Sequence, residues 1–517
     1  MISPVPSSVD DPLLHRRQFL FASGGAHELP GGRGVDVGND CRLSVHPELE
    51  VTRVESNGVL GILLGFILDP ERPERSNSEI AAGLLEETSD PADLARATSA
   101  FGGRWVLLRR DAASWTIVHD ATGQRQVCFT RAREAEGFLC ASDAGIIASR
   151  LGLEMEPAAV DFIRSRGESD FEVYWMPGDR TLFKEVAALL PNHFLTLPEG
   201  DVHRFWPSAR PEPRDPDEAL DFCLGTLRGL VDAAGRRFAL SVPMTAGWDS
   251  RLMLALCRDR ASGLYAYTFD YPNMPRNSRD VWVPARLLPT LGIAHHVIPY
   301  PETTDARFKR LHRLGNVAAN NAYCADAEAL AAVYPAGHVC VTGDAAEVVK
   351  CFHARDPGSR DPVDAHELAG LSGLGTHPFV VGAMADWLAE AGDPAVDLLD
   401  LFCWEQMAGR WQPKIRAEYD MVQECLAPLN HRRLLETMLG VDPELRRAPD
   451  FTFFARMVEA LWPETLSVPV NPPETQSRKR RVLNLLKKTG LHRLIPPAAK
   501  QNLKIALGGH GPTKPAS

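Results

Sequence analysis

The sequence has little of what a membrane-spanning, disulfide-bonded or nucleic-acid-binding protein needs. Its longest apolar run, Val59 to Leu68, is too short to cross a bilayer, and its first residues have no basic and apolar signal segment. Ten cysteines are scattered from Cys41 to Cys425 without a CxxC pair, which predicts reduced thiols rather than disulfides or structural zinc. The net charge of −11 argues against nucleic-acid binding by the protein as a whole, because a phosphate backbone needs a basic face. We therefore expect a cytoplasmic protein with no nucleic acid and no membrane as a partner.

The first part of the chain is rich in short, apolar, β-forming segments. At 517 residues with 44% hydrophobic side chains, two domains are expected. The segments up to Trp206 predict a mostly antiparallel α+β domain over residues 1–206, interrupted by one helix near 79–87. A strand pair at 181–185 and 194–197 is expected to close it, and the proline-rich residues 207–216 are typical of a linker.

The pattern changes after the linker to strands that alternate with helices. Expected strands at 238–242, 264–269, 295–298 and 339–342 predict a parallel sheet covered by helices, with ligands beyond the carboxyl ends of the strands. From about Leu398 the chain is helical. We therefore expect a second domain over 217–495, a basic and amphipathic segment over 478–504, and a disordered tail over 496–517.

A glycine turn after the strand at 238–242 is the strongest functional signal. The turn opens an apolar helix, a position typical of phosphate-binding loops. Thr245 and Ser250 supply hydroxyls, Gly247 admits a phosphate close to the backbone, and Asp249 supplies a carboxylate for magnesium. No lysine follows the glycine, so the turn is not a Walker loop. An ordinary strand-to-helix turn is the alternative interpretation.

The run from Leu240 to Ser250 resembles the pyrophosphate loop of the asparagine synthetase-like ATP pyrophosphatases. Other segments agree with that family in their order along the chain, and they lie at 101–108, 119–129, 141–143, 178–186, 190–195 and 428–430. The resemblance implies an α/β fold. A glutaminase-like α+β sandwich of the Ntn-hydrolase type over 1–206 is followed over 217–495 by a parallel-sheet ATP pyrophosphatase domain, of the adenine nucleotide alpha hydrolase-like kind, with C-terminal helices.

The resemblance also implies a chemistry. A substrate carboxylate attacks ATP, giving an acyl-adenylate and pyrophosphate, and a nitrogen nucleophile then displaces AMP. It implies ATP and Mg²⁺ as cofactors, Asp249 and Glu347 as metal ligands, and Glu347 and Lys350 as catalytic residues. The nucleotide-binding positions that it implies are Leu240, Ser241, Thr245, Ala246, Gly247, Asp249, Ser250, Phe269 and Gly343.

Two departures from the family pattern shape the expected function. Glutaminases of this type use an N-terminal cysteine, but position 2 is Ile2, and Cys41 inside the chain has no free α-amine, so we expect no glutamine hydrolysis. Glu347 stands where the family has aspartate. Asp344 is an alternative metal ligand, or else the cap of the next helix. β-Lactam synthetases and lasso-peptide cyclases are relatives without that cysteine.

The expected substrates are a small-molecule or peptide carboxylate and an amine or ammonia. A homodimer is an open alternative for the oligomeric state. Lys350, Lys414 and Lys479 are candidates for the lysine that neutralises charge during amide formation. The group Trp404-Glu405-Gln406 with Arg410-Trp411 either lines the acceptor pocket or packs a helix pair. Asparagine synthesis from free ammonia and a non-catalytic scaffold are the alternative functions.

Overall fold

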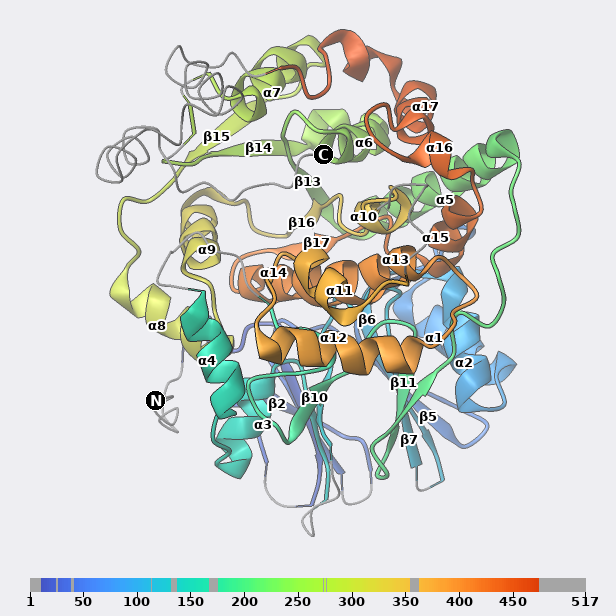
Figure 1. Ribbon diagram of the computed structural model, residues 1–517, viewed down its shortest axis with the longest axis vertical. Coiled ribbons are helices and arrows are strands. Elements are labelled where there is room, and N and C mark those ends of the chain that lie inside the picture. The colour runs from blue at the N-terminus through green and yellow to red at the C-terminus, as the bar shows by residue number, and fades with distance from the viewer. Residues whose placement is uncertain are drawn as a thin grey trace.

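The structure is a computed structural model. It describes residues 11–473, except 25–26, 39–40, 113, 132–136, 167–174, 273, 276 and 354–361. Ile2, Lys479, the basic segment near the end of the second expected domain and the expected tail at 496–517 therefore lie outside the described residues. Two antiparallel sheets form the lower half of the molecule in Figure 1, and a parallel sheet with its helices forms the upper half.

The two antiparallel sheets have six strands each, in the orders β10-β8-β9-β1-β3-β2 and β12-β11-β7-β6-β5-β4. The strands of the first sheet are β1 (Phe19–Ser23), β2 (Arg33–Val35), β3 (Cys41–Val45), β8 (Cys128–Thr130), β9 (Leu139–Ala141) and β10 (Val186–Ala188). The strands of the second sheet are β4 (Val51–Ser56), β5 (Val59–Leu68), β6 (Gly102–Asp111), β7 (Ser114–His119), β11 (His193–Leu197) and β12 (Asp201–Arg204).

These sheets face each other and are also covered on their outer faces. Side chains alternate along each strand, so Phe19 and Phe21 of β1 join the core between the sheets, whereas Leu20 points to the other side. On the second sheet α1 (Asn77–Glu87) packs against β4 and β5, and α2 (Pro91–Ala97) against β11. On the first sheet α3 (Ala144–Leu151) packs against β8, β9 and β10. Burial on both faces explains the uninterrupted apolar run of β5.

The strand pair expected at 181–185 and 194–197 is wrong. The first strand lies instead at β10, which pairs with β8, while β11 belongs to the other sheet. Residues 181–184 form a turn because the Thr181 hydroxyl accepts a hydrogen bond from the Phe183 N–H at 3.1 Å. The expectation of one helix in this region is also wrong, since α2, α3 and α4 (Pro157–Ser165) accompany α1.

The third sheet is parallel throughout, with the order β15-β14-β13-β16-β17. Its strands are β13 (Ala239–Pro243), β14 (Tyr265–Asp270), β15 (His295–Pro299), β16 (His338–Val341) and β17 (Glu424–Leu426). Leu240 and Val242 of β13 join the core formed with α5 and α6, whereas Tyr267 and Cys340 pack on the opposite face beneath α9. The predicted fold class, an antiparallel α+β sandwich followed by a helix-covered parallel sheet, is confirmed.

Helices surround the parallel sheet and continue to the end of the described chain. They are α5 (Pro216–Arg237), α6 (Trp248–Leu256), α7 (Arg279–Thr290), α8 (Ala306–Gly315), α9 (Asn321–Val333), α10 (Ala346–Val349), α11 (Ala365–Leu371), α12 (Pro378–Ala391), α13 (Leu398–Phe402), α14 (Gln412–Tyr419), α15 (Arg432–Leu439), α16 (Pro443–Arg446) and α17 (Thr452–Leu461). A π-helical segment, Cys403–Trp411, connects α13 to α14. Along the described residues, no helix has the length and apolar character that crossing a membrane requires.

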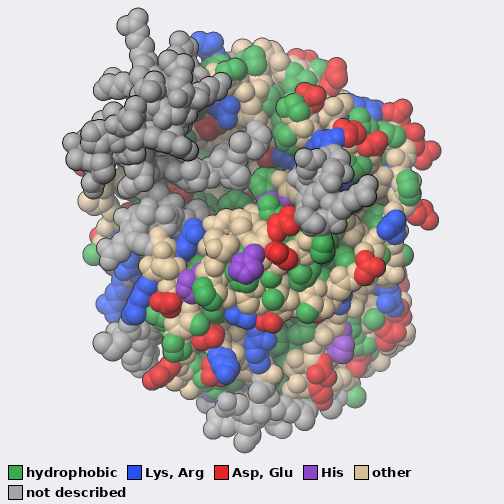
Figure 2. All heavy atoms as spheres, viewed as in Figure 1, with side chains coloured by type: hydrophobic (Ala, Val, Ile, Leu, Met, Phe, Trp, Pro, Cys, Tyr) green, Lys and Arg blue, Asp and Glu red, His purple; other side chains and the backbone are tan. Residues whose placement is uncertain are grey.

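Buried charges join the antiparallel sandwich to the parallel sheet. Arg104 of β6 donates through Nη1 and Nη2 to the Asp420 carboxylate at 2.5 and 2.8 Å, and through Nη1 to Glu424 of β17 at 2.6 Å. Burial opposes ionisation of Glu424, but the guanidinium groups of Arg125 and Arg104 outweigh it and hold the pKa of this carboxyl well below its usual range. The outer surface is different, because acidic and basic side chains are interspersed over the face in Figure 2.

Candidate active site

The glycine turn connects the carboxyl end of β13 to the N-terminus of α6. The loop is held by its own side chains: the Thr245 and Ser250 hydroxyls lie 3.1 Å apart, and the Gly247 N–H donates to Thr245 Oγ1 at 3.2 Å. The Ala246 N–H donates to Asp280 Oδ1 of α7 at 3.0 Å. Gly247 is the N-cap of α6, and among the described residues no side-chain cap of this helix is present. The first N–H groups of α6 therefore remain available to an anion.

Nothing in the described part of the chain demands a glycine at position 247. Its φ of −81° is open to any residue, and an added Cβ would meet Thr245 Oγ1 at 3.5 Å and Asn471 Oδ1 at 3.9 Å, which are ordinary contacts. A glycine that the protein's own packing does not require is consistent with a ligand that approaches the backbone.

The loop after β16 meets this turn directly. A Cβ added to Gly343 would lie 2.6 Å from the Cβ of Asp249, so the two loops touch at a position where only glycine fits. The Lys350 ammonium makes an ion pair with the Asp249 carboxylate. It also lies 5.4 Å from the ring centre of Phe451 and 4.9 Å from that of Phe454. The parallel sheet thus brings Asp249, Gly343 and Lys350 together.

Glu347 joins the same group from the first turn of α10. Its Oε2 accepts a hydrogen bond from Gln412 Nε2 at 2.7 Å, while Gln412 Oε1 accepts one from the Ala345 N–H at 2.8 Å. Burial raises the pKa of Glu347 to about 7, and the nearby Asp249 carboxylate adds to the rise while Lys350 opposes it. A carboxylate whose proton affinity is raised by burial and by a second carboxylate marks a place where a cation is favoured.

Asp344 makes an ion pair and does not cap the helix that follows it. Its carboxylate accepts from Arg416 Nε at 2.5 Å and from Arg416 Nη2 at 2.8 Å, and from the Thr342 hydroxyl at 3.1 Å. The N-cap of α10 is Ala345, without a side-chain hydrogen bond, so the expectation that Asp344 caps this helix is wrong. The bidentate ion pair occupies the carboxylate that a metal would need.

The other expected nucleotide-binding residues differ in their surroundings. Leu240 is buried in the core, and the Ser241 hydroxyl lies 2.6 Å from the Tyr334 hydroxyl. Phe269 is the penultimate residue of β14, and its ring centre lies 5.6 Å from that of Tyr271. Lys414 pairs with Glu418 on the same helix, α14. The roles expected for these residues stay predictions.

The aromatic group at 404–411 packs the interior. The Trp404 indole donates to the Ala121 carbonyl at 2.8 Å, and Glu405 accepts from the Trp387 indole at 2.8 Å and pairs with Arg204 at 2.5 Å. Of the two interpretations offered for this group, packing agrees with these contacts.

Three residues of the site were missed by sequence reasoning. Gln412, Arg416 and Asp280 lie far from the two loops along the chain, and no motif marks them. Among the described residues, no group of three or more His, Cys, Asp or Glu side chains is arranged to hold a metal ion. Asp249 and Glu347 would therefore supply at most two ligands, which suits Mg²⁺ bound partly through a phosphate-bearing substrate.

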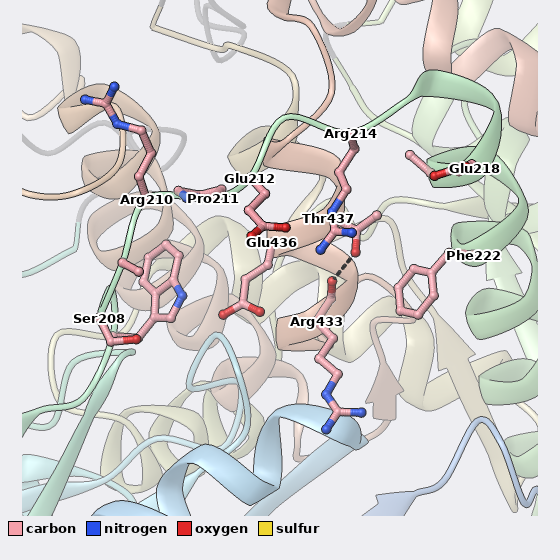
Figure 3. A pocket seen from close by; sticks show the side chains of 13 residues that line it. Ser208, Arg210, Pro211, Glu212, Arg214, Glu218, Phe222, Arg433, Glu436 and Thr437 are labelled. Atoms are coloured by element: carbon pink, nitrogen blue, oxygen red, sulfur yellow. Dashed lines mark hydrogen bonds between the residues drawn. The ribbon is translucent and has the colours of Figure 1, made fainter.

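A cavity also lies elsewhere, at the linker. It has a volume of about 440 Å³ and is lined by the linker, the start of α5 and α15. Figure 3 shows Phe222 at one side, with Glu212, Glu436 and Arg214 side chains in the middle. None of the residues expected to bind nucleotide lines this cavity. We therefore place the candidate site at the two loops, where the charged side chains of Asp249, Glu347 and Lys350 lie together.

Replacing Gly343 by alanine should separate the two loops. The added methyl group would overlap Asp249, and relieving the overlap should cost about 1–3 kcal/mol of unfolding free energy and displace Asp249 from Lys350. Denaturant unfolding measures the first effect and ATP binding by calorimetry the second. Gly263→Ala is the matched control, because a Cβ there meets nothing within 4 Å and its cost should stay within about 0.5 kcal/mol. Equal effects of the two substitutions would contradict the packing described.

No family model matches the sequence, and no curated protein matches it either. Among solved structures, the chain is similar to glutamine phosphoribosylpyrophosphate amidotransferase from B. subtilis complexed with ADP and GMP, with 11% identity and a TM-score of 0.23, over 72% of this chain and 88% of that one. A glutamine-dependent NAD⁺ synthetase from Acinetobacter baumannii, in complex with ADP, matches with 15% identity and a TM-score of 0.21. This match covers 48% of this chain and 55% of that one. These scores are too low to carry an argument about function.

Proposed function

We propose that this protein is an ATP-dependent ligase that forms an amide bond. It adenylates a substrate carboxylate and transfers the acyl group to ammonia or an amine. The observation that carries the proposal is the contact between the loops after β13 and β16, where Gly343 lies against Asp249. This contact gathers the uncapped N-terminus of α6, two carboxylates and the ammonium group of Lys350 at the carboxyl edge of a parallel sheet.

These groups suit the charges of adenylation. A carboxylate oxygen forms a bond to the α-phosphorus of ATP, and the bond from that phosphorus to the bridging oxygen breaks, so negative charge grows on the departing pyrophosphate. The first N–H groups of α6 and the Lys350 ammonium would stabilise that charge. Asp249 and Glu347 would hold Mg²⁺, which supplies positive charge to the phosphates when bound.

The second step transfers the acyl group. The amine nitrogen bonds to the acyl carbon, the bond from this carbon to the AMP oxygen breaks, and AMP leaves with the electron pair while the nitrogen loses a proton. The amide product therefore needs no glutamine hydrolysis. In this proposal the sandwich is a scaffold, and it contacts the segment after β17 where the Asn430 amide donates to the Asp120 carboxylate at 2.8 Å.

Pyrophosphate release tests the proposal. The full-length protein is incubated with ATP, Mg²⁺ and pooled carboxylates with and without amines, and ATP binding is measured separately by calorimetry. Release that requires a carboxylate supports adenylation, and AMP should then accumulate in equal amount. Absence of both ATP binding and release would contradict the proposal and favour a scaffold. Release with aspartate and ammonium alone would instead identify asparagine synthesis.

A further inference from the structure

A buried carboxylate lies in the middle of α9, outside the residues assigned so far. Asp326 is 3% exposed, and its Oδ2 accepts hydrogen bonds from the Tyr419 hydroxyl at 2.6 Å and from the Tyr271 hydroxyl at 3.4 Å. Its other oxygen, Oδ1, is buried and accepts no hydrogen bond from the described part of the protein. A buried carboxylate oxygen without a donor is costly, so a donor that the protein itself does not provide is expected there.

Aromatic rings surround this carboxylate. Tyr271 and Tyr300 directly follow β14 and β15, and their ring centres lie 5.5 Å apart. Tyr323, of α9, and Tyr419 meet edge to face with centres 6.0 Å apart. Tyrosine faces attract cations, and a carboxylate among them adds a full negative charge. The combination favours a positively charged ligand with N–H groups.

The position of Asp326 connects it to the two loops. The Tyr419 hydroxyl donates a hydrogen bond to Asp326, and the Arg416 guanidinium lies 5.8 Å from the ring centre of Tyr419. Arg416 in turn pairs with Asp344 in the loop after β16. Tyr271 follows the strand next to β13. Two side chains, those of Tyr419 and Arg416, thus separate Asp326 from the loop after β16. Asp326 lies toward the carboxyl ends of the parallel strands, which is the edge of such a sheet where substrates bind.

The charges around Asp326 also favour a cation. Burial raises the pKa of Asp326 to about 7, and the Glu418 carboxylate adds to the rise, whereas the hydrogen bonds from Tyr419 and Tyr271 oppose it. Two nearby cationic side chains already have carboxylate partners, because Lys414 pairs with Glu418 and Arg416 pairs with Asp344. A cation at Oδ1 would lower this pKa and restore the missing donor.

We propose that Asp326, with Tyr271 and Tyr419, binds the protonated primary amine of the nitrogen-donating substrate, of which ammonium is the smallest form. This inference rests on the proposed function for its meaning, because it gives the second substrate a site of its own. The N–H groups of the ammonium would donate to Oδ1, and its charge would face the tyrosine rings.

Thermal unfolding of the full-length protein tests the inference without ATP. The melting temperature is measured in ammonium chloride, methylammonium chloride, tetramethylammonium chloride and sodium chloride at equal ionic strength. Methylammonium should give a saturable rise beyond sodium, and tetramethylammonium should not, because it has no N–H group. The rise should be larger at about pH 8 than at about pH 6, since the carboxylate of Asp326 is ionised only above its raised pKa.

Variants locate the response. Asp326→Asn should weaken methylammonium binding at least about tenfold, because a charge-assisted hydrogen bond is lost. Asp270→Asn, at the exposed end of β14, is the matched control and should respond like the wild type. An unchanged response of Asp326→Asn would overturn the inference. If that variant does not fold, equal responses to methylammonium and tetramethylammonium would overturn it.

The two proposals can fail separately. Amine binding without pyrophosphate release for any carboxylate would contradict the proposed function, whereas release without an amine response would contradict only this inference. A response to ammonium and methylammonium indicates a substrate amine.

Discussion

Replacing Asp249 by asparagine is expected to lower the rate of pyrophosphate release at least about a hundredfold. The substitution keeps the size of the side chain but removes the charge that pairs with Lys350 and that would hold Mg²⁺ beside Glu347. The Asp249 side chain is 38% exposed, so the folded state should lose little stability. The rate is measured at saturating ATP over a range of Mg²⁺ concentrations, and the requirement for Mg²⁺ should rise.

Asp259→Asn is the matched control for this prediction. Asp259 is an exposed aspartate in the 3₁₀ turn that follows α6, so its substitution should leave both the rate and the Mg²⁺ requirement unchanged. A variant Asp249→Asn with the wild-type rate and Mg²⁺ requirement would remove the loop contact as the basis of the proposed function.

Replacing Arg104 by methionine is expected to cost about 3–5 kcal/mol of unfolding free energy. Methionine fills much of the same space, but it leaves the Asp420 carboxylate buried without its bidentate partner and leaves Glu424 with Arg125 and Arg17. Because these side chains join β6 to β17, unfolding should also separate into two transitions, the sandwich and the parallel sheet no longer unfolding together. Calorimetry measures the number of transitions, and denaturant titration measures the free energy.

Arg236→Met provides the comparison. Arg236 pairs with Asp232 on the surface of α5, where the two side chains are 54% and 41% exposed, and the loss of such a pair should cost less than about 1 kcal/mol. Similar costs for the two variants, with a single transition in each, would show that the buried charges do not hold the two parts of the molecule together.

Local patterns were sufficient for the elements that are long or strongly patterned. The apolar run from Val59 to Leu68 is a single strand, β5, and the alanine-rich segment near 325–333 lies in α9. Short elements were predicted less well. β17 has three residues within a helical region, and the pairing of β10 depends on β8, more than fifty residues earlier. Such strands form because a distant partner offers hydrogen bonds, and no local periodicity records that partner.

The candidate site likewise has one part that the sequence indicates and another that it does not. The strand, the glycine turn and the helix around Gly247 are neighbours along the chain, so the sequence alone indicates an anion-binding loop. The meeting of Asp249 with Gly343 links positions nearly a hundred residues apart. The pairing of Asp344 with Arg416 could not be read from the sequence, because an aspartate just before a helix is as compatible with a helix cap as with an ion pair.

The sequence by itself determined the class of the molecule: short strands before the linker, alternating strands and helices after it, and a glycine turn at the end of a strand, where the second pattern predicts a ligand. Only the tertiary structure decided which side chains share the site. The physical reason is that periodicity and turn chemistry act between neighbours along the chain. The contacts of Asp249 and Asp326, in contrast, depend on the order of parallel strands and on buried charges whose partners come from distant segments.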